Sequence, residues 1–343
     1  MKRFEFTRRS FAIAITMAAA SLLFVVPFSA LSSNKSIQPN AEPYVVNYPH
    51  KKSVISTPAQ VRITEYKEYK EYKSEESGTF LHPPKRTNFL FIGLDNNLLA
   101  DALMVGTLYS ETGDIRLMSI PRDMYTYIPP NRIEQMHEDG LRIPKELKIN
   151  AVRAFGGRLH GVKYLKAQLG EMLGVHFHYY VEVELAAFKR IVDAIGGVSM
   201  HISQDLKYSD PYQNLFIDIP AGYHHLNGDM AEGVVRYRGF ITGDLMRNTM
   251  QAEFMSQLIK QSITRDAIMN DPLTLASTIL SDISTNASVL EMAKYLPYIG
   301  QLNMDGVSTY TLPGAPEYRN GVSWFIPDTQ MLPDVVAQVF YGY

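Results

Sequence analysis

Residues 231–251 read AEGVVRYRGFITGDLMRNTMQ, and the interpretation of the whole chain is built outward from this stretch. Arg236 and Arg238 stand two positions apart in a run that also contains adjacent valines and a tyrosine. Such a run favours a β-strand, and alternate residues of a strand leave the same face. We therefore expect a strand that directs both guanidinium groups to one site.

The turn GFITG follows, and a helix is predicted after it. Asp244, Arg247 and Gln251 recur there at i, i+3 and i+7, which places them on one helix face. Arginine offers a planar fork of donors that matches phosphate oxygens and stays charged near neutral pH. Three arginines, a carboxylate and an amide therefore predict a site for phosphate or pyrophosphate.

The composition is that of an ordinary globular protein. The chain has 343 residues, of which 46% are hydrophobic and 20% are charged, with a formal net charge of −2. This balance supplies no global basic field, so nucleic acid is not an expected partner. The sequence contains no cysteine, which excludes disulfides, thiol catalysis and cysteine-bound zinc.

The N-terminus predicts a membrane segment. Residues 11–31 carry no charge and are long enough to cross a bilayer as a helix. Four basic residues precede them, so residues 1–10 are expected in the cytoplasm and the rest of the chain outside. A cleaved signal peptide is the alternative, because small residues occur near position 30, but the length of the apolar run favours an uncleaved signal-anchor.

Two further regions follow the predicted anchor. Residues 32–85 are rich in polar residues and include the repeat EYKEYKEYK at 65–73, which predicts an extracytoplasmic stem or linker. Residues 86–343 have globular character, with strands and helices interleaved and no second linker. We predict a single α/β domain here, with a central sheet and helices on its faces. Strands are predicted at 88–94, 103–109, 114–120, 179–183, 198–203, 307–312 and 322–326, and helices at 161–173, 185–195 (closed by Gly196 and Gly197), 226–233, 253–263, 272–283, 288–299 and after an N-cap at Asp328.

Two aspartates lie near the end of the first predicted strand. Asp95 follows it and Asp101 opens the second strand. Ligands of open α/β sheets bind outside the carboxyl ends of strands, and two carboxylates there can share one Mg²⁺ that completes its shell with water and phosphate oxygens. The alternative is that both are ordinary turn residues.

Arg122 and Asp123 directly follow another predicted strand. Arg122 is either a further phosphate clamp or half of a surface ion pair with Asp123. Lys148 and Asn150 are candidate donors nearby, although a solvated loop is the commoner place for a lysine. His176 and His178 would share a strand face and are interpreted as structural.

The sequence contains no P-loop, no Gly-x-Ser-x-Gly and no dinucleotide-binding glycine pattern in its proper context, so those enzyme classes have no support. An apolar series in the helix after Arg247 suits either an ordinary core or the wall of a tunnel for a long lipid. Its members are Met250, Phe254, Met255, Leu258 and Ile259.

Several blocks in fixed order now point to a known family. They are NFLFIGLD, DALMVGT, SIPRDMY, DAIGGV, RYR and GD-x-x-R-x-x-x-Q, with LPG and GVSWFIPD near the C-terminus. Over residues 86–343 the chain resembles the LytR–CpsA–Psr family, whose layout of signal-anchor and stem it also shares. The resemblance implies a three-layer α/β/α sandwich with a central mixed sheet that encloses a hydrophobic lipid tunnel.

The resemblance also implies an activity. Members of the family move glycopolymers such as teichoic acid or capsular polysaccharide from polyprenyl-pyrophosphate carriers to peptidoglycan at the bacterial cell membrane, with Mg²⁺ as cofactor. By motif position, Asp95 and Asp101 match the metal-site aspartates. The pyrophosphate-binding set would be Arg122, Arg236, Arg238, Arg247 and Gln251, and the catalytic set Arg122, Asp101, Arg238 and Asp244. Either Asp101 or Asp123 would take the proton of the acceptor hydroxyl.

The chain departs from the family pattern at one place. The family has a longer segment between the two aspartates, with Arg-Ser before the second and Thr after it. Here only residues 96–100 separate them, and the second lies in Ala-Asp-Ala. A catalytically weak regulator or attenuator of envelope synthesis that keeps the lipid pyrophosphate site is therefore the main alternative. A pyrophosphatase acting on the same carrier is another.

Overall fold

The computed structural model describes residues 85–95, 98–240, 244–262, 279, 281–288, 295, 303 and 306–342. The predicted cytoplasmic end, membrane segment and stem lie outside these residues, as do most of the predicted helices at 272–283 and 288–299. Among the helices that are described, none has the length and apolar character needed to span a membrane.

Outside the 231–251 stretch, the predicted strands and helices that fall on described residues occur in the predicted order, but residues 130–155, 206–225 and 314–319 contain elements that were not predicted. In chain order the described elements are β1 (Arg86–Leu94), β2 (Ala100–Tyr109), β3 (Ile115–Ile120), β4 (Tyr125–Tyr127), α2 (Pro130–Glu138), β5 (Glu146–Lys148), α3 (Ile149–Phe155), α4 (Gly157–Leu173), β6 (Tyr179–Glu184), α5 (Leu185–Ala194), β7 (Val198–Ile202), β8 (Leu206–Asp210), the short 3₁₀ helix η1 (Pro211–Gln213), β9 (Leu215–Ile219), β10 (Gly222–Leu226), α6 (Gly228–Arg236), α7 (Asp244–Ser262), β11 (Ile283–Thr285), β12 (Val307–Thr311), β13 (Gly314–Arg319), β14 (Val322–Pro327) and α11 (Leu332–Phe340).

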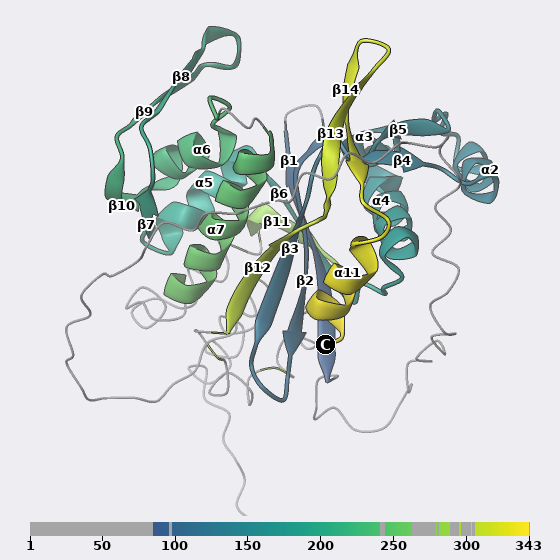
Figure 1. Cartoon of the computed structure of the whole chain (residues 1–343), viewed down its shortest axis with the longest axis horizontal. Coiled ribbons are helices and arrows are strands. Elements are labelled where there is room, and N and C mark those ends of the chain that lie inside the picture. The colour runs from purple at the N-terminus through teal and green to yellow at the C-terminus, as the bar shows by residue number, and fades with distance from the viewer. Residues whose placement is uncertain are drawn as a thin grey trace, which may run out of the picture.

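A six-stranded mixed sheet forms the centre of the fold, with strand order β11-β6-β1-β2-β3-β12 (Figure 1). Strand β1 pairs antiparallel with β2 and parallel with β6. Strand β3 pairs antiparallel with β2 and parallel with β12. The antiparallel hairpin β1–β2 brings the end of β1, the start of β2 and the end of β3 to the same edge of the sheet.

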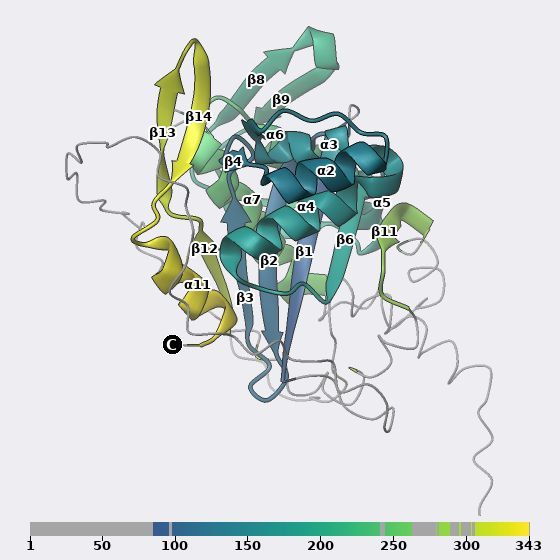
Figure 2. The ribbon, with the colours of Figure 1, turned by 90° about the vertical axis from the view of Figure 1, so that its right-hand side faces the viewer.

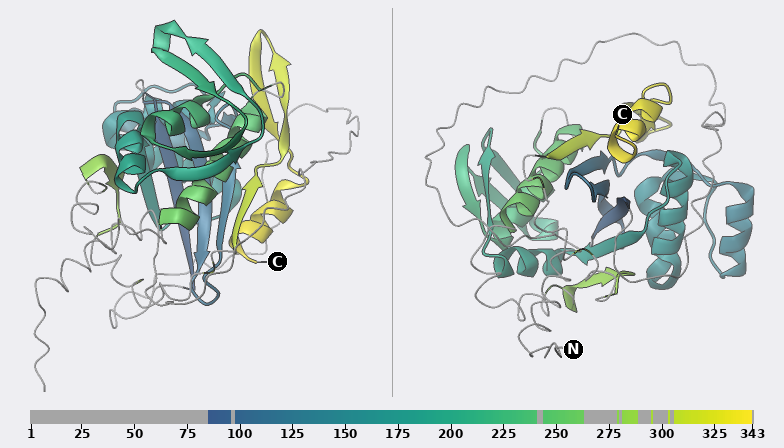
Figure 3. Two further views of the ribbon diagram at one scale, coloured as in Figure 1. Left: turned by 90° about the vertical axis from the view of Figure 1, so that its left-hand side faces the viewer. Right: turned by 90° about the horizontal axis from the view of Figure 1, so that it is seen from below.

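Both faces of this sheet are buried, which explains why β1 is a continuous apolar run. Leu90 and Ile92 pack into one core together with residues of α3, α4 and α11. Phe89 and Phe91 point the other way, into a second core shared with α5, α6 and α7. Figures 2 and 3 show these two groups of helices on opposite sides of the sheet, so the expected central mixed sheet with helices on both faces is confirmed.

Two hairpins project from the molecule at the end of the sheet where β1 and β3 finish. Strands β8 and β9 form one of them and β13 and β14 form the other (Figures 1 and 2). The second hairpin is tied to the body of the domain because Phe325 N–H donates to the carbonyl of Asp123 at 2.9 Å. Elements distant in sequence therefore meet around one edge of the sheet.

Two boundary predictions need correction. Ile283, expected at the end of a helix, opens the strand β11 instead, because it pairs with Val183 of β6. The N-cap of the last helix is Met331 rather than Asp328. Asp328 nevertheless accepts N–H bonds from Gln330 at 2.9 Å and Met331 at 3.1 Å, so it stabilises the turn that leads into α11.

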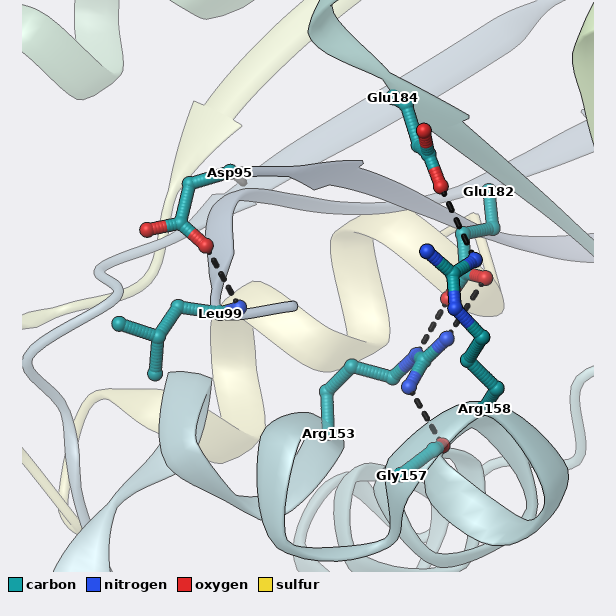
Figure 4. Close-up of polar contacts among 7 residues, drawn as sticks. All are labelled: Asp95, Leu99, Arg153, Gly157, Arg158, Glu182 and Glu184. Atoms are coloured by element: carbon teal, nitrogen blue, oxygen red, sulfur yellow. Dashed lines mark hydrogen bonds and ion pairs between the residues drawn. The ribbon is translucent and has the colours of Figure 1, made fainter. Parts of the chain in front are cut away.

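A buried ion pair joins the helical layer to the sheet (Figure 4). Arg153 of α3 and Glu182 of β6 form a two-pronged pair, with Arg153 Nη2 2.8 Å from Glu182 Oε1 and Nε bonded to Oε2. The side chains are only 2% and 10% exposed. Arg153 Nη1 also donates to the Gly157 carbonyl at 2.7 Å. A Cβ at Gly161 would lie 2.3 Å from Arg153 Nη1, so glycine is required at that position.

Removing one member of this pair should destabilise the domain strongly. We expect Glu182→Gln to lower the free energy of unfolding by about 3–5 kcal/mol, because it leaves the Arg153 guanidinium buried without its countercharge. Urea denaturation followed by circular dichroism measures the loss. A double variant, Arg153→Met with Glu182→Leu, should recover much of it, because no buried charge remains.

The neighbouring pair of Arg158 and Glu184 provides the matched control (Figure 4). Its members are 3.2 Å apart and their side chains are 76% and 57% exposed. Solvent screens such a pair, so Arg158→Ala should change stability far less than Glu182→Gln. Equal losses of unfolding free energy in the two variants would show that burial of the Arg153–Glu182 pair does not increase its effect on stability.

The two histidines before β6 are structural, as predicted, but they do not lie on a strand. Their rings meet edge to face with centroids 5.4 Å apart. His178 Nδ1 accepts the backbone N–H of Asn88 at 3.0 Å. Burial, followed by the charges of His176 and Lys166, lowers the pKa of His178 from 6.5 to about 4. The folded protein therefore holds this ring in its neutral form.

This shift predicts a loss of stability in mild acid. Between pH 6.5 and about 4 the unfolded state takes up the His178 proton more readily than the folded state, so stability is complete above pH 6.5 and falls as the pH drops. We expect His178→Gln, whose side chain can still accept the Asn88 N–H, to flatten this fall. Thermal unfolding between about pH 7 and 5 tests it; parallel curves for the two proteins would contradict the assignment.

Candidate functional site

A cavity of about 1030 Å³ opens at the edge of the sheet described above. It lies between the sheet and the helices α5 and α7, and this volume is at the upper end of ordinary ligand sites. Asp244 begins α7, but its side chain lies outside the described residues. All the other predicted site residues line the cavity: Asp95, Asp101, Arg122, Arg236, Arg238, Arg247 and Gln251.

The two aspartates come from the β1–β2 hairpin. Asp95 Oδ1 accepts the Leu99 N–H at 2.8 Å, which closes the short loop (Figure 4). Gly93 pairs with Ala102 and Leu94 with Ala100, so Asp101 is the extra residue of a β-bulge. Bulges change the direction of a side chain and are frequent beside active sites. The bulge therefore accounts for a carboxylate of β2 that lines the cavity.

Arg122 reaches the same carboxylate from the end of β3. Its Nη1 donates to Asp101 Oδ1 at 2.8 Å, and the two side chains are 18% and 34% exposed. The sequence had offered Asp123 as a possible partner for Arg122. Asp123 instead pairs with Lys148 of β5 at 3.0 Å, and both of these side chains also line the cavity. The adjacent residues Arg122 and Asp123 therefore each belong to a different ion pair, and both pairs line the cavity.

The prediction that Arg236 and Arg238 lie on one strand is wrong. Arg236 is the last residue of helix α6, whose N-cap Asn227 accepts the Met230 N–H at 2.9 Å. This cap and the packing of α6 against α5 and α7 outweigh the strand propensity of the adjacent valines. Tyr237 has φ −57° and ψ 130°, which ends the helix and begins an extended segment.

Both arginines nevertheless reach the cavity by this different route. Arg236 Nη1 bonds to Glu232 one helical turn earlier, and its Nη2 donates to Gln213 of the β8–β9 hairpin at 2.6 Å. Arg238 follows in the extended segment and is exposed. The end of α6 and the extended segment after it therefore bring both arginines to the cavity, although a single strand was expected to do so.

Helix α7 confirms the predicted helical face. Arg247 and Gln251 both line the cavity, and Arg247 is only 3% exposed. A guanidinium held this deep favours an anion beside it. Gln251 Nε2 donates to the carbonyl of Val235 at 2.9 Å, which fixes α7 against the end of α6. The second turn of α7 and the end of α6 therefore form one unit.

The inner part of the cavity is apolar. Of the apolar series predicted in α7, Phe254, Met255 and Leu258 line the cavity, whereas Met250 and Ile259 belong to the packed core behind it. Sheet and α5 residues complete this wall: Phe91, Met104, Val181, Val183, Phe188 and Ile191. The series is therefore divided between the cavity wall and the packed core.

Sequence analysis missed several lining residues that come from elements far along the chain. Glu146 of β5, Gln213 of η1 and Trp324 of β14 all reach the cavity mouth. Only Trp324 stood in a segment that had been singled out, GVSWFIPD, and no role was assigned to it. Neither periodicity nor a local motif could have brought these three together, because tertiary packing alone makes them neighbours.

The donor set limits which metal the site suits. Within the described ranges, no group of three or more His, Cys, Asp or Glu side chains is placed to hold a metal ion. Asp95 and Asp101 are two carboxylates in a cavity that four arginines also line, and that set fits Mg²⁺, which binds one or two carboxylates and keeps water and phosphate oxygens. Zinc, which prefers nitrogen and sulfur ligands, fits less well.

The chain is similar in sequence to known proteins. It is 26% identical over 260 residues to an uncharacterised protein of Staphylococcus aureus, covering 71% of this chain and 59% of that protein. It is 30% identical over 231 residues to the polyisoprenyl-teichoic acid–peptidoglycan teichoic acid transferase TagU of Bacillus cereus, covering 63% of this chain and 69% of TagU.

Solved structures show the same fold. The structure of TagT bound to LIIa-WTA superposes with a TM-score of 0.58 at 24% identity, covering 74% of this chain and 89% of TagT. The model of the LytR_cpsA_psr family matches residues 54–340. The chain therefore belongs to the LytR–CpsA–Psr family.

Proposed function

We propose that this protein is a membrane-anchored phosphotransferase that moves a glycopolymer from a polyprenyl-pyrophosphate carrier to peptidoglycan. One observation carries the proposal: four arginines and three aspartates line the same cavity as a large apolar wall. The activity in the name of the relative TagU requires a site of this kind. The TagT complex with LIIa-WTA supports the same assignment, since that protein shares the fold.

The cavity suits an amphipathic donor. Its inner wall, which includes Phe91, Phe254 and Leu258, would bury the polyprenyl chain, and apolar burial contributes about 25 cal/mol per Å². The arginines at the mouth would bind the pyrophosphate with charge-assisted hydrogen bonds. We therefore assign the inner part as the lipid tunnel and the mouth as the reaction centre.

The reaction is a phosphoryl transfer with a simple atom balance. The oxygen of an acceptor hydroxyl attacks the phosphorus that carries the glycopolymer, and the bond from that phosphorus to the bridging oxygen breaks. The polyprenyl phosphate leaves with the bonding electrons. Arg122, Arg238 and Arg247 stabilise the negative charge that builds on the leaving phosphate, which is the main task in such a transfer.

The hydroxyl proton goes to a carboxylate. Asp101 and Asp123 both line the mouth, and each is held by a cation, Arg122 and Lys148 respectively. Asp101 is also a candidate ligand for the metal, so Asp123 is the better placed to accept the proton. The Lys148 pairing orients its carboxylate.

Asp95 and Asp101 would hold Mg²⁺, which neutralises charge on the phosphate oxygens. Arg122 would then exchange its Asp101 partner for a phosphate oxygen. Residues 11–31 would anchor the protein in the cell membrane, with the domain on the outer side beside its lipid-borne donor and peptidoglycan acceptor.

A second function remains in competition, and the β1–β2 loop favours it. Asp95 already accepts the Leu99 N–H, and Leu98 is held at φ 62°, a left-handed conformation uncommon for leucine. A loop constrained in this way would fit a protein that binds the lipid pyrophosphate but transfers slowly. Such a protein would regulate envelope synthesis rather than carry it out.

Substitutions at the arginines test the transferase assignment. We expect Arg122→Ala and Arg238→Ala each to lower the rate of transfer roughly 100-fold or more. Each substitution removes a positive charge that would stabilise the leaving phosphate. Arg238→Lys should recover only part of the rate, since lysine has no two-pronged fork. The assay follows glycopolymer transfer from a polyprenyl-pyrophosphate donor, and native mass spectrometry detects carrier lipid retained by the purified protein.

Arg158→Ala is the matched control, because this arginine is 76% exposed at the side chain and does not line the cavity. Its transfer rate should equal that of the wild type. Wild-type rates in Arg122→Ala and Arg238→Ala would refute the proposal that these arginines bind the leaving phosphate. A wild-type protein that retains carrier lipid but transfers nothing would establish the regulatory function in place of the transferase.

The metal assignment has its own test. We expect Asp95→Asn to raise the Mg²⁺ concentration needed for half-maximal transfer and to weaken Mn²⁺ binding measured by electron paramagnetic resonance. Asp123→Asn should instead lower kcat with an unchanged metal requirement, because it removes the proton acceptor alone. If Asp95→Asn left Mn²⁺ binding intact, the two-aspartate site would be wrong.

A further inference from the structure

A second, smaller hollow of about 150 Å³ adjoins the mouth of the main cavity. Three of its lining residues, Glu146, Val322 and Trp324, also line the main cavity, so the two spaces are adjacent. The others are Tyr125, Arg319 and Asn320. Strands β4 and β5 and the β13–β14 hairpin thus build a side pocket next to the reaction centre.

The pocket has an aromatic wall. Tyr125 and Trp324 meet edge to face, with ring centroids 5.7 Å apart and an interplanar angle of 70°. Trp324 is half-buried, and it is the single tryptophan of the chain. A bridge between Met124 and Phe325 holds the two aromatic strands together. A fixed aromatic face of this kind packs well against the C–H groups of a sugar ring.

The polar groups of the pocket are held in place by their own partners. Arg319 Nη2 donates to Glu317 Oε2 at 2.9 Å, and its Nε bonds to the other oxygen. The Tyr125 hydroxyl is hydrogen-bonded to Glu146. Asn320 occupies the hairpin turn with φ 50°. Glu317 neutralises Arg319, so the pocket offers oriented donors and acceptors without the excess positive charge that a phosphate needs.

Asp123 connects this pocket to the reaction centre. Its carbonyl accepts the Phe325 N–H, next to Trp324, and its carboxylate pairs with Lys148. Lys148 is in turn the register partner of Tyr125 in the β4–β5 ladder. Neighbouring residues therefore join the side pocket to the carboxylate proposed to accept the hydroxyl proton, which itself lines the main cavity.

We propose that this side pocket binds one pyranose ring of the acceptor glycan, stacked on Trp324 and hydrogen-bonded by Arg319, Asn320 and Glu146. The inference rests on the transferase function proposed above and adds the acceptor subsite to it. The volume of about 150 Å³ is of the size of one pyranose ring. The donor is held from the other side, by the arginines and the apolar tunnel.

Fluorescence of the single tryptophan gives a direct readout of binding. Chitotetraose titrated into the full-length protein should produce a saturable change in emission, and maltotetraose should produce a weaker one. Arg319→Ala and Asn320→Gly should each raise the half-saturation concentration roughly tenfold. Glycine is chosen at Asn320 because it keeps the turn at φ 50° without strain. No emission change with either sugar would overturn the proposal.

Tyr318→Ala is the matched control for both substitutions. Tyr318 lies on the same hairpin, is 74% exposed and lines neither space. Its titration should match that of the wild type. A loss of affinity in Tyr318→Ala equal to that of Arg319→Ala would mean that the hairpin as a whole, and not the pocket, responds to the sugar.

Transfer kinetics show whether the sugar in the pocket belongs to the glycan acceptor or to the lipid donor. Arg319→Ala, whose side chain lines the side pocket and not the main cavity, should raise the KM for the glycan acceptor roughly tenfold while the KM for the lipid donor stays constant. Trp324→Ala should raise the acceptor KM as well. Trp324→Phe, which keeps an aromatic face and guards against a folding defect, should recover most of the affinity. A raised donor KM with an unchanged acceptor KM would overturn the assignment, because the pocket would then hold the donor sugar. If the wild type saturates with chitotetraose but transfers nothing, the sugar pocket stands and the transferase function fails.

Discussion

The structure depends on a central sheet that is closely packed on one face and lines a large cavity on the other. The face toward α3, α4 and α11 is filled by interlocking side chains, whereas the face toward α5 and α7 leaves a cavity of about 1030 Å³. An apolar hollow of this size forfeits the dispersion contacts that close packing supplies. A long apolar ligand would restore them. On the opposite face, the buried pair of Arg153 and Glu182 joins α3 to β6.

Charge at the cavity mouth is arranged in pairs. Arg122 is matched with Asp101, Arg236 with Glu232 and Lys148 with Asp123. These pairs hold the cations in position, so a phosphate bound as proposed would cost less conformational freedom. An incoming pyrophosphate would exchange partners with them rather than meet isolated charges. Preorganised charge of this kind is the largest single contribution to many enzymatic rates.

Much of the fold could be predicted from local patterns. The continuous apolar run of β1 indicated a strand buried on both faces, and the glycines after α5 indicated the helix end at Ala194. The prediction for the stretch around Arg236 was wrong. Two valines favoured a strand there, whereas the cap at Asn227 and packing against α7 produced a helix. Local propensity spans only about 1 kcal/mol, so tertiary contacts easily outweigh it.

The sequence by itself identified residues that the structure brings to one cavity: the arginines, the aspartates and the helical face with Arg247 and Gln251. Those inferences needed only residue type and spacing along one element. The tertiary structure decided what no spacing encodes, namely the bulge at Asp101, the cavity and the pocket around Trp324. These features arise where β2, β5, α7 and β14 meet, and contacts between elements far apart in sequence leave no periodic trace in any one of them.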